Sequence, residues 1–506
     1  MLRFSGYNLR VFLVLLCFIL ISGAGWGQQT SSPEIPANPR DLKYPELKYD
    51  PPKVGRYRHV LSNGVVVFLA EDHDFPLVNV SVFVRTGSYL DPKGKEGLAN
   101  MVGSQMRAGG TTTMTAEQFD EEAAFLAAEI SSGIGDTQGS ANLSCLSKDL
   151  GRGLELFFNM LKTPGFQANR IALYKNQVIQ GMERRNDESS SIQAREWARL
   201  MRGDSHFSTA WSTKNSVESI SREDLMAFHQ KYYHSGNFIF AVSGDFSTGE
   251  MLAKLEKVLQ GWPATGEKVP PVPGPQFTPA PGIYVVNKAD VNQGRVTLGH
   301  LGSMRNNPDY YALTIMNDIL GGSGFVSRLM TRVRSDEGLA YSVGSDFGLG
   351  IYYDGIFQAS FQSKSATVAQ ATAIVLDEIK KMRTQKVTSG ELERAINYRV
   401  EVFPRIFATA AAISGTFAND EYTGRPAGFW DSYRARIRAI TAEDVLRVAQ
   451  KYLHPDRLVF LAVGSVDDIL KGNPDKPEFA LNKFSENGAI KRIPLPDPLT
   501  MAYPKE

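Results

Sequence analysis

The stretch ISREDLMAFHQKYYHSGNFIFAVSG, from Ile220 to Gly244, decides the fold because the chain contains it twice. ITAEDVLRVAQKYLHPDRLVFLAVG, from Ile440 to Gly464, shares with it an Ile, a Glu-Asp pair, a Gln-Lys-Tyr run and a His, all at one constant offset. Self-similarity of this kind marks a repeated structural unit. We therefore predict two tandem homologous domains.

Each copy reads as a helix followed by a strand. Ser221 or Thr441 stands ahead of an acidic first turn, which is typical of a helix N-terminus. Elsewhere VVVFLAED and VNVSVFVRTGS have strand patterns, whereas AEQFDEEAAFLAAEI and KDLGRGLELFFNMLK have helical spacing. The predicted fold class is α+β, with sheets that have helices packed on one face. One large doubly wound domain would not explain the repeat.

Proline-rich segments divide the chain. At 506 residues it is too long for one core. The segment 263–282, PATGEKVPPVPGPQFTPAPG, carries seven prolines and predicts an extended linker. Residues 28–52 are polar and proline-rich, which predicts an extended leader. The predicted domains are 53–262 and 283–468, followed by a tail, 469–506, for which contact with a partner and a free end are both open.

The first residues, MLRFSGYNLRVFLVLLCFILISGAGWGQQ, place two arginines ahead of an apolar run from Val11 to Ile21. This pattern indicates a secretory signal peptide, 1–27, because eleven apolar residues are too few for a spanning helix of roughly 20. We expect export to the periplasm, with secretion into the medium as the alternative. Cys17 leaves with the signal, so Cys145 has no partner for an internal disulfide.

The composition excludes several functions. The chain is 42% hydrophobic and 22% charged, as in an ordinary soluble protein. Lys+Arg number 55 and Asp+Glu 54, so no strong overall field draws nucleic acid or anionic lipid. The chain contains no GxSxG elbow, no phosphate-binding GxxxxGK[ST] and no CxxC.

The segment EGLANMVGSQM, from Glu96 to Met106, has the frame of a metal-binding helix without its ligands. Asn100, Gly103 and Ser104 stand at i, i+3 and i+4, so they share one face of a helix. The inverted zinc motif HxxEH has two His and a Glu at these positions. Asn, Gly and Ser cannot hold zinc or activate water on it.

The longer segment EGLANMVGSQMRAGGTTTMTAEQFDEEAAFLAAEI resembles the metal-site region of the pitrilysin and insulinase metallopeptidases, which reads GLAHxxEHMxxxGT. Gly97, Leu98, Ala99, Gly110 and Thr111 fit that pattern, and the similarity extends from about residue 53 to 468. The resemblance implies a mainly antiparallel sheet in each domain. Within the family the chain resembles the non-catalytic subunit type, such as the alpha subunit of mitochondrial processing peptidase and bacterial two-chain homologues.

The resemblance places the last zinc ligand of the family, a Glu on another helix, at about Gly181 in YKNQVIQGMERR. Glu183 is nearby, but two residues turn a side chain by roughly 200° around a helix, onto the wrong face. All four metal positions, Asn100, Gly103, Ser104 and Gly181, therefore carry residues unsuited to zinc. We predict no metal or cofactor in this chain, and zinc in a homologous partner subunit that carries HxxEH.

The second half contains ILGGSGFVSRLMTRVRSDEGLAYSVGSDFG, in which Arg334 and Tyr341 are seven residues apart. From the residues alone, Phe325, Leu329 and Val333 mark one helical face, Arg334 complements the dipole at the helix C-terminus, and Tyr341 is a half-buried strand aromatic. The resemblance implies instead that Arg334 and Tyr341 bind the substrate backbone and the oxyanion that forms at the partner's metal.

The run GGSGF, with Gly321, Gly322 and Gly324, resembles the glycine-rich loop of inactive subunits. Glycines there permit a substrate chain to approach the backbone closely. A tight turn before a helix explains the run equally well.

Three functions compete. The leading hypothesis is a non-catalytic, substrate-binding subunit of an exported two-chain zinc metallopeptidase, to which a peptide or unfolded segment adds as a strand at a sheet edge. The alternative is a structural or scaffolding member of the family, for which Arg334 and Tyr341 would have no use. The third is a self-sufficient hydrolase, although His229 and His234, the one close histidine pair, do not share a helical face.

Overall fold

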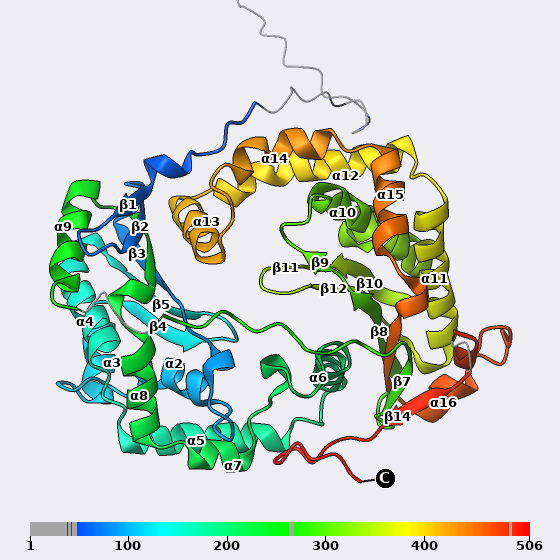
Figure 1. Ribbon diagram of the computed structural model, residues 1–506, viewed down its shortest axis with the longest axis horizontal. Coiled ribbons are helices and arrows are strands. Elements are labelled where there is room, and N and C mark those ends of the chain that lie inside the picture. Colours follow the sequence, from blue (N-terminus) through cyan, green and yellow to red (C-terminus); the bar gives the residue numbers. More distant parts are fainter. Residues whose placement is uncertain (1–37, 39–41, 43–47, 263–267, 485–487, 506) are drawn as a thin grey trace, which may run out of the picture. The chain divides into compact units, whose positions relative to one another are not determined.

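Two six-stranded mixed sheets follow one another along the chain (Figure 1). The computed structural model describes Asn38, Leu42 and residues 48–262, 268–484 and 488–505. The predicted signal peptide and most of the predicted leader lie outside these residues, and both sheets belong to the unit Asp50–Glu506. No helix in the described part of the chain combines the length and the apolar character needed to cross a bilayer.

The N-terminal sheet has the strand order β1-β2-β6-β3-β5-β4. Only β2 and β6 pair in parallel; all other neighbours are antiparallel. The central strand β6 is buried along nearly its whole length, as its unbroken apolar run predicts. The strands are β1 (Arg58–Val60), β2 (Val66–Glu71), β3 (Leu77–Val84), β4 (Glu129–Ile134), β5 (Gly139–Leu146) and β6 (Phe238–Gly244).

The C-terminal sheet has the order β14-β7-β13-β8-β12-β10, in which β7, β13, β8, β12 and β10 repeat the order of β2, β6, β3, β5 and β4, while β14, from the end of the chain, takes the edge place of β1. Here β7 pairs in parallel with β13 and β14, and the remaining pairs are antiparallel. The repeat strands β6 and β13 occupy the same place, which confirms the predicted duplication and α+β class. The strands are β7 (Gly282–Asn287), β8 (Gln293–Leu301), β10 (Ala340–Phe347), β12 (Ile356–Lys364), β13 (Val459–Gly464) and β14 (Ile490–Ile493).

Helices of each half pack against its own sheet. The helices of the repeat, α8 and α15, both begin with a capping box, in which the side chain of Ser221 or Thr441 accepts the N–H of the Asp three residues on. The predicted N-caps are therefore confirmed. The helices of these layers are α3 (Ala116–Phe125), α4 (Leu150–Lys162), α8 (Arg222–Tyr232) and α9 (Thr248–Leu259), and then α10 (Tyr310–Asn317), α11 (Val368–Thr384), α15 (Ala442–Tyr452) and α16 (Val466–Lys471). Within them α8 packs on α2 (Leu98–Ala108), and α15 packs on α10 and α11.

Each sheet is also contacted by one helix from the other half. The helix α6 (Ser189–Arg202) packs on β8 and β13, and α13 (Ala410–Thr423) packs on β2, β3 and β6 (Figure 1). These exchanged helices are equivalent, because each follows a long helix, α5 (Ala168–Glu183) or α12 (Ser389–Val402). The predicted packing on one face is therefore incomplete, since the opposite face of each sheet receives a helix from the other half.

Strand alternation shows that the exchanged helices lie on the second face. Val67 and Leu69 of β2 belong to the core under the N-terminal helices. Phe68, between them, points to the other side, where its ring lies 6.3 Å from that of Phe417 on α13. Arg58 reinforces this contact with two hydrogen bonds of 3.1 and 3.0 Å to the Glu421 carboxylate.

The reciprocal contact is also apolar. Ile192, Trp197 and Met201 of α6 form a buried cluster with residues of β7 and β13. At its margin the Gln193 side-chain amide donates to the Thr297 hydroxyl over 2.9 Å. Two separate apolar contacts therefore join the halves.

The linker and the tail both contact the N-terminal half. Residues 268–281 contain neither helix nor strand, and the Tyr89 hydroxyl donates to the Pro270 carbonyl over 2.9 Å. The tail passes from β14 to the N-terminal half, where the Arg185 guanidinium donates to the Pro498 carbonyl over 3.1 Å. The described part of the tail therefore packs on its own chain. The domain boundaries stay predictions.

We expect Phe417→Ala to lower the free energy of unfolding by about 3–5 kcal/mol, because it opens a cavity at the contact of α13 with the N-terminal sheet. Phe417 is 3% exposed. Phe125→Ala is the control, since Phe125 is 86% exposed and its loss should cost no more than about 0.5 kcal/mol. Equal urea denaturation midpoints for the two variants would show that α13 does not hold the halves together.

Candidate functional site

Three of the four metal positions lie on α2 (Leu98–Ala108). The helix begins after Gly97, whose φ of +102° favours glycine. The Asp91 carboxylate caps it by accepting the N–H groups of Gly97 and Ala99, both over 2.8 Å. Burial raises the pKa of Asp91 to about 6, although these N–H groups act in the opposite direction. The helical frame is thus fixed without any metal ligand.

The helix α2 packs directly on β4, the edge strand of its sheet. The Asn100 amide donates to the Ile134 carbonyl over 2.8 Å, and the Arg107 guanidinium donates to the Ile130 carbonyl over 3.0 Å. A Cβ at Gly103 would stand 2.4 Å from the Ile134 nitrogen. These contacts cover backbone groups that an edge strand otherwise leaves unpaired.

The C-terminal half contains the same arrangement. Asn317 donates its amide to the Ser345 carbonyl of β10 over 3.2 Å, and a Cβ at Gly321 would stand 2.3 Å from the Ser345 nitrogen. The Asn and Gly are four residues apart here and three in α2, because the turn Asp318–Gly322 is π-helical. We call the pairs Asn100/Gly103 and Asn317/Gly321 the Asn–Gly clasps.

The other two metal positions differ from each other. Ser104 is half-buried, and its hydroxyl lies 3.5 Å from the Gln105 amide. Gly181 lies on α5, which contacts α2, and a Cβ there would meet nothing within 4 Å. In the described ranges no group of three or more His, Cys, Asp or Glu side chains is placed to hold a metal. The residues at these four positions do not fit zinc.

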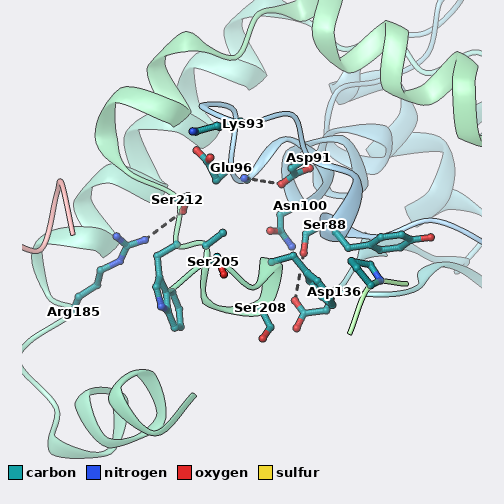
Figure 2. A pocket seen from close by; sticks show the side chains of 16 residues that line it. Ser88, Asp91, Lys93, Glu96, Asn100, Asp136, Arg185, Ser205, Ser208 and Ser212 are labelled. Atoms are coloured by element: carbon teal, nitrogen blue, oxygen red, sulfur yellow. Dashed lines mark hydrogen bonds between the residues drawn. The ribbon is translucent and has the colours of Figure 1, made fainter. Parts of the chain in front are cut away.

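A polar cavity of about 810 Å³ lies beside Asn100 (Figure 2). One of its walls is Arg185, which donates to the Ser212 hydroxyl over 3.3 Å and whose pKa is lowered by burial. No sequence pattern indicated this cavity, because its walls come from segments far apart in the chain. Further lining residues are Ser88, Asp91, Lys93, Glu96, Asp136, Ser205, Phe207, Ser208 and Trp211.

Arg334 and Tyr341 form one exposed cluster with Phe325. The Arg334 guanidinium carbon lies 4.6 Å from the centre of the Phe325 ring and 4.8 Å from that of Tyr341. Tyr341 is 84% exposed and Phe325 70%. Within the described ranges no carboxylate pairs with Arg334. The cation is thus held by two aromatic faces and keeps its hydrogen-bond donors available.

This geometry differs from the interpretation by residue pattern alone. Leu329 and Val333 are fully buried, as that pattern predicts, but Phe325 is not on their face. It lies in the short 3-10 turn Gly324–Val326, because Gly324, with φ of +62°, turns the chain before the helix. Tyr341 is 84% exposed, so the predicted half-burial of Tyr341 is wrong.

The three glycines of GGSGF have different surroundings. Gly321 belongs to the clasp, and a Cβ at Gly322 would stand 2.6 Å from the Asn317 amide nitrogen. Gly324 alone of the three has open space around it. Packing therefore explains Gly321 and Gly322, and contact of the run with a substrate stays a prediction.

Restoring the metal ligands should not restore the metal site. We expect the variant Asn100→His/Gly103→Glu/Ser104→His/Gly181→Glu to lack stoichiometric zinc and to melt at a lower temperature, because a side chain at position 103 displaces the backbone of β4. Gly103→Glu alone should cost about 1–3 kcal/mol, whereas Gly181→Glu should be neutral. Elemental analysis showing one zinc per chain at wild-type stability would contradict this account.

Comparison with protein families finds two models that match this chain. Residues 66–206 match the model described as insulinase, peptidase family M16, and residues 219–398 match the model described as peptidase M16 inactive domain. The two models together match well over half of the chain.

Individual relatives agree with the family models. An uncharacterized zinc protease of Rickettsia bellii is 25% identical over 342 residues, or 66% of this chain and 80% of the relative. The non-peptidase homolog YmxG of Helicobacter pylori is 24% identical over 408 residues, covering 79% and 92%. The crystal structure of a peptidase M16 inactive domain from Pseudomonas fluorescens superposes with a TM-score of 0.71 at 25% identity, covering 80% of this chain and 97% of that one. The match to an inactive domain and to a relative named as a non-peptidase supports a non-catalytic member, and the chain belongs to the insulinase family of peptidases, family M16.

Proposed function

We propose that this protein is the non-catalytic, substrate-binding subunit of an exported, periplasmic two-chain zinc metallopeptidase that acts on peptides or unfolded segments. Its partner is a homologous subunit that carries HxxEH and the zinc ion. One observation carries the proposal: the Arg334 guanidinium lies over two exposed rings, those of Phe325 and Tyr341. A guanidinium and a phenol held in this way are available to a second molecule.

The chemistry of the pair suits a peptide bond under attack. When bound in the partner, zinc polarises the scissile carbonyl and activates water. The Arg334 guanidinium and the Tyr341 hydroxyl supply N–H and O–H donors, which stabilise the oxygen that becomes negative. The exposed Phe325 and Val326 offer apolar contact to a substrate side chain.

The clasps limit where a peptide adds as a strand. Asn100 and Gly103 cover the edge of β4, and Asn317 and Gly321 cover the middle of β10. The beginning of β10 is different, because Tyr341 and Ser342 are exposed and the pairing with β12 is irregular between Ala340 and Val343. Irregular pairing of this kind is common beside functional sites. This irregularity and the exposed side chains support the addition of the peptide along the first residues of β10.

The alternative function is a structural member of the family without a role in peptide hydrolysis. A scaffold needs the exchanged helices and the two sheets, but it does not need an exposed Tyr341 stacked on Arg334. Measurements on the assembled complex distinguish the two functions.

In the complex with the HxxEH subunit, we expect Tyr341→Phe to lower peptide turnover by about 10² to 10³, the usual effect of losing one oxyanion donor. The matched control is Tyr398→Phe, another exposed tyrosine of the same half, which should keep full activity. The loss should appear in kcat more than in KM, since the contact forms in the transition state. Wild-type turnover by Tyr341→Phe would refute the assigned role.

We expect the mature chain, tagged and purified from its own host, to copurify in equal amount with a protein of similar length that carries HxxEH. Mass spectrometry of the purified material identifies that protein. Recovery of the chain alone, or with unrelated envelope proteins, would contradict the two-chain peptidase and favour the scaffold.

A further inference from the structure

A second cavity, of about 630 Å³, lies between α11 and the C-terminal sheet. Its floor is apolar and consists of the buried side chains Ile283, Leu298 and Phe460, from β7, β8 and β13. Leu376 of α11 and Phe484 line it further. Its volume is within the roughly 300–1,000 Å³ usual for small-molecule sites.

Two cations, Lys380 and Arg383, line the same cavity from the last turns of α11. Neither forms an ion pair with a carboxylate of the described residues. The Arg383 Nε is buried and has no hydrogen-bond partner there. Asp456 also lines the cavity, but it lies 3.9 Å from the Arg457 guanidinium. A buried donor without a partner is costly, so an acceptor at this place is favoured.

The equivalent place in the N-terminal half is filled. Counted from the 3-10 turn before each helix, Lys162 of α4 corresponds to Lys380, and Phe158 corresponds to Leu376. The ring of Trp262 lies 6.5 Å from that of Phe158, and the Lys162 ammonium lies 5.4 Å from the Trp262 ring. The ammonium also donates to the Val258 carbonyl.

A shorter helix explains why the C-terminal half is hollow. Trp262 follows α9, which has 12 residues, whereas the corresponding α16 has 6. The strand residue Phe238, whose ring lies 5.0 Å from Trp262, is replaced by Leu458. Lys380 therefore occupies the place of Lys162. The Trp262 ring and the Val258 carbonyl, which Lys162 contacts, have no counterpart beside Lys380 among the described residues.

We propose that this cavity binds a single-chain anionic amphiphile, a long-chain carboxylate. The acyl chain packs on Ile283, Leu298 and Phe460, and the carboxylate accepts hydrogen bonds from Arg383 and Lys380. The near-zero net charge excludes attraction of anionic lipid by the overall field of the protein. It does not exclude binding of one anion by a local pair of cations beside an apolar floor. The site is independent of Arg334 and Tyr341.

The test uses the full mature chain and myristate below its aggregation concentration, followed by isothermal titration calorimetry. We expect one saturable site, with methyl myristate bound more weakly and tetradecyltrimethylammonium most weakly. Arg383→Gln should weaken myristate binding about tenfold, as for a lost hydrogen bond to a charged group, and leave methyl myristate unchanged. Lys148→Gln, at a lysine whose side chain is 77% exposed in the other half, is the matched control.

Filling the cavity provides the second arm. Leu376→Phe and Leu458→Phe each copy the residue of the N-terminal half, and we expect each to weaken myristate binding at least about tenfold by occupying the space. Circular dichroism checks that each variant is folded, and two variants guard against the failure of one. The proposal is overturned by absence of saturable binding to the wild type, by equal affinity for the cationic amphiphile, or by unchanged affinity in the folded cavity-filling variants.

Discussion

The exchange of α6 and α13 between the halves is the constraint on which the remaining structure depends. A sheet with one exposed apolar face is not stable in water, and here each second face is buried by a helix from the other half. Phe417 on the N-terminal sheet and Trp197 on the C-terminal sheet occupy the two contacts. The proline-rich linker therefore does not have to hold the halves together by itself.

The same packing explains why a metal-binding frame persists without its chemistry. At position 103 a catalytic Glu and a close helix–strand contact exclude each other, since any Cβ there collides with the backbone of β4. In this chain the contact is present, and it repeats the Asn–Gly clasp that the C-terminal half forms with β10. At this place the N-terminal half thus has the same helix–strand packing as the C-terminal half.

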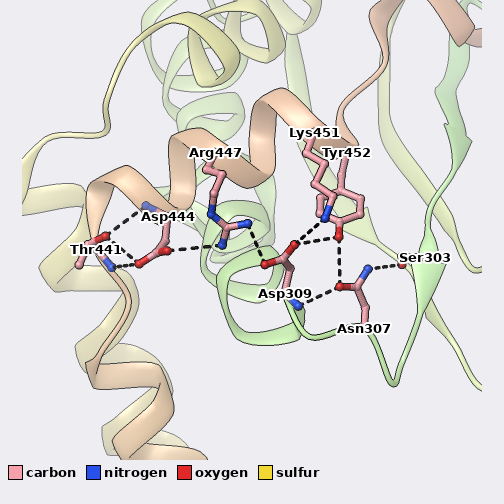
Figure 3. Close-up of polar contacts among 8 residues, drawn as sticks. All are labelled: Ser303, Asn307, Asp309, Thr441, Asp444, Arg447, Lys451 and Tyr452. Carbon is pink, nitrogen blue, oxygen red and sulfur yellow. Dashed lines mark hydrogen bonds and ion pairs between the residues drawn. The ribbon is translucent and has the colours of Figure 1, made fainter.

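Charged side chains of the C-terminal half differ in whether they have an ion-pair partner. The polar network around Asp309, which receives Arg447, Lys451 and Tyr452 of α15, ties helices of the C-terminal half together and leaves its charges paired (Figure 3). Arg334 and Arg383, in contrast, have no carboxylate partner among the described residues. Paired charges stabilise the fold, whereas charges kept at an exposed ring or a cavity are available for a ligand.

The sequence by itself determined the duplication, the fold class and the helix caps. These depend on local pattern: the repeated Ile220 and Ile440 segments, the capping residues Ser221 and Thr441, and the period of apolar residues. The spacing of Asn100, Gly103 and Ser104 on one helical face also indicated three altered metal positions, and the resemblance to the family implied Gly181 as the fourth.

Only the tertiary structure decided which faces and edges are covered. The exchange of α6 and α13, the contact of Gly103 with β4, the exposure of Tyr341 and the cavity beside Arg383 all bring together residues far apart in the chain. Phe325 shows the reason. Its apolar character and its spacing from Leu329 predicted that Phe325 is buried, but the turn at Gly324 points its side chain to solvent. Whether a side chain is buried depends on helices and strands that pack over it, and its neighbours in sequence do not specify these.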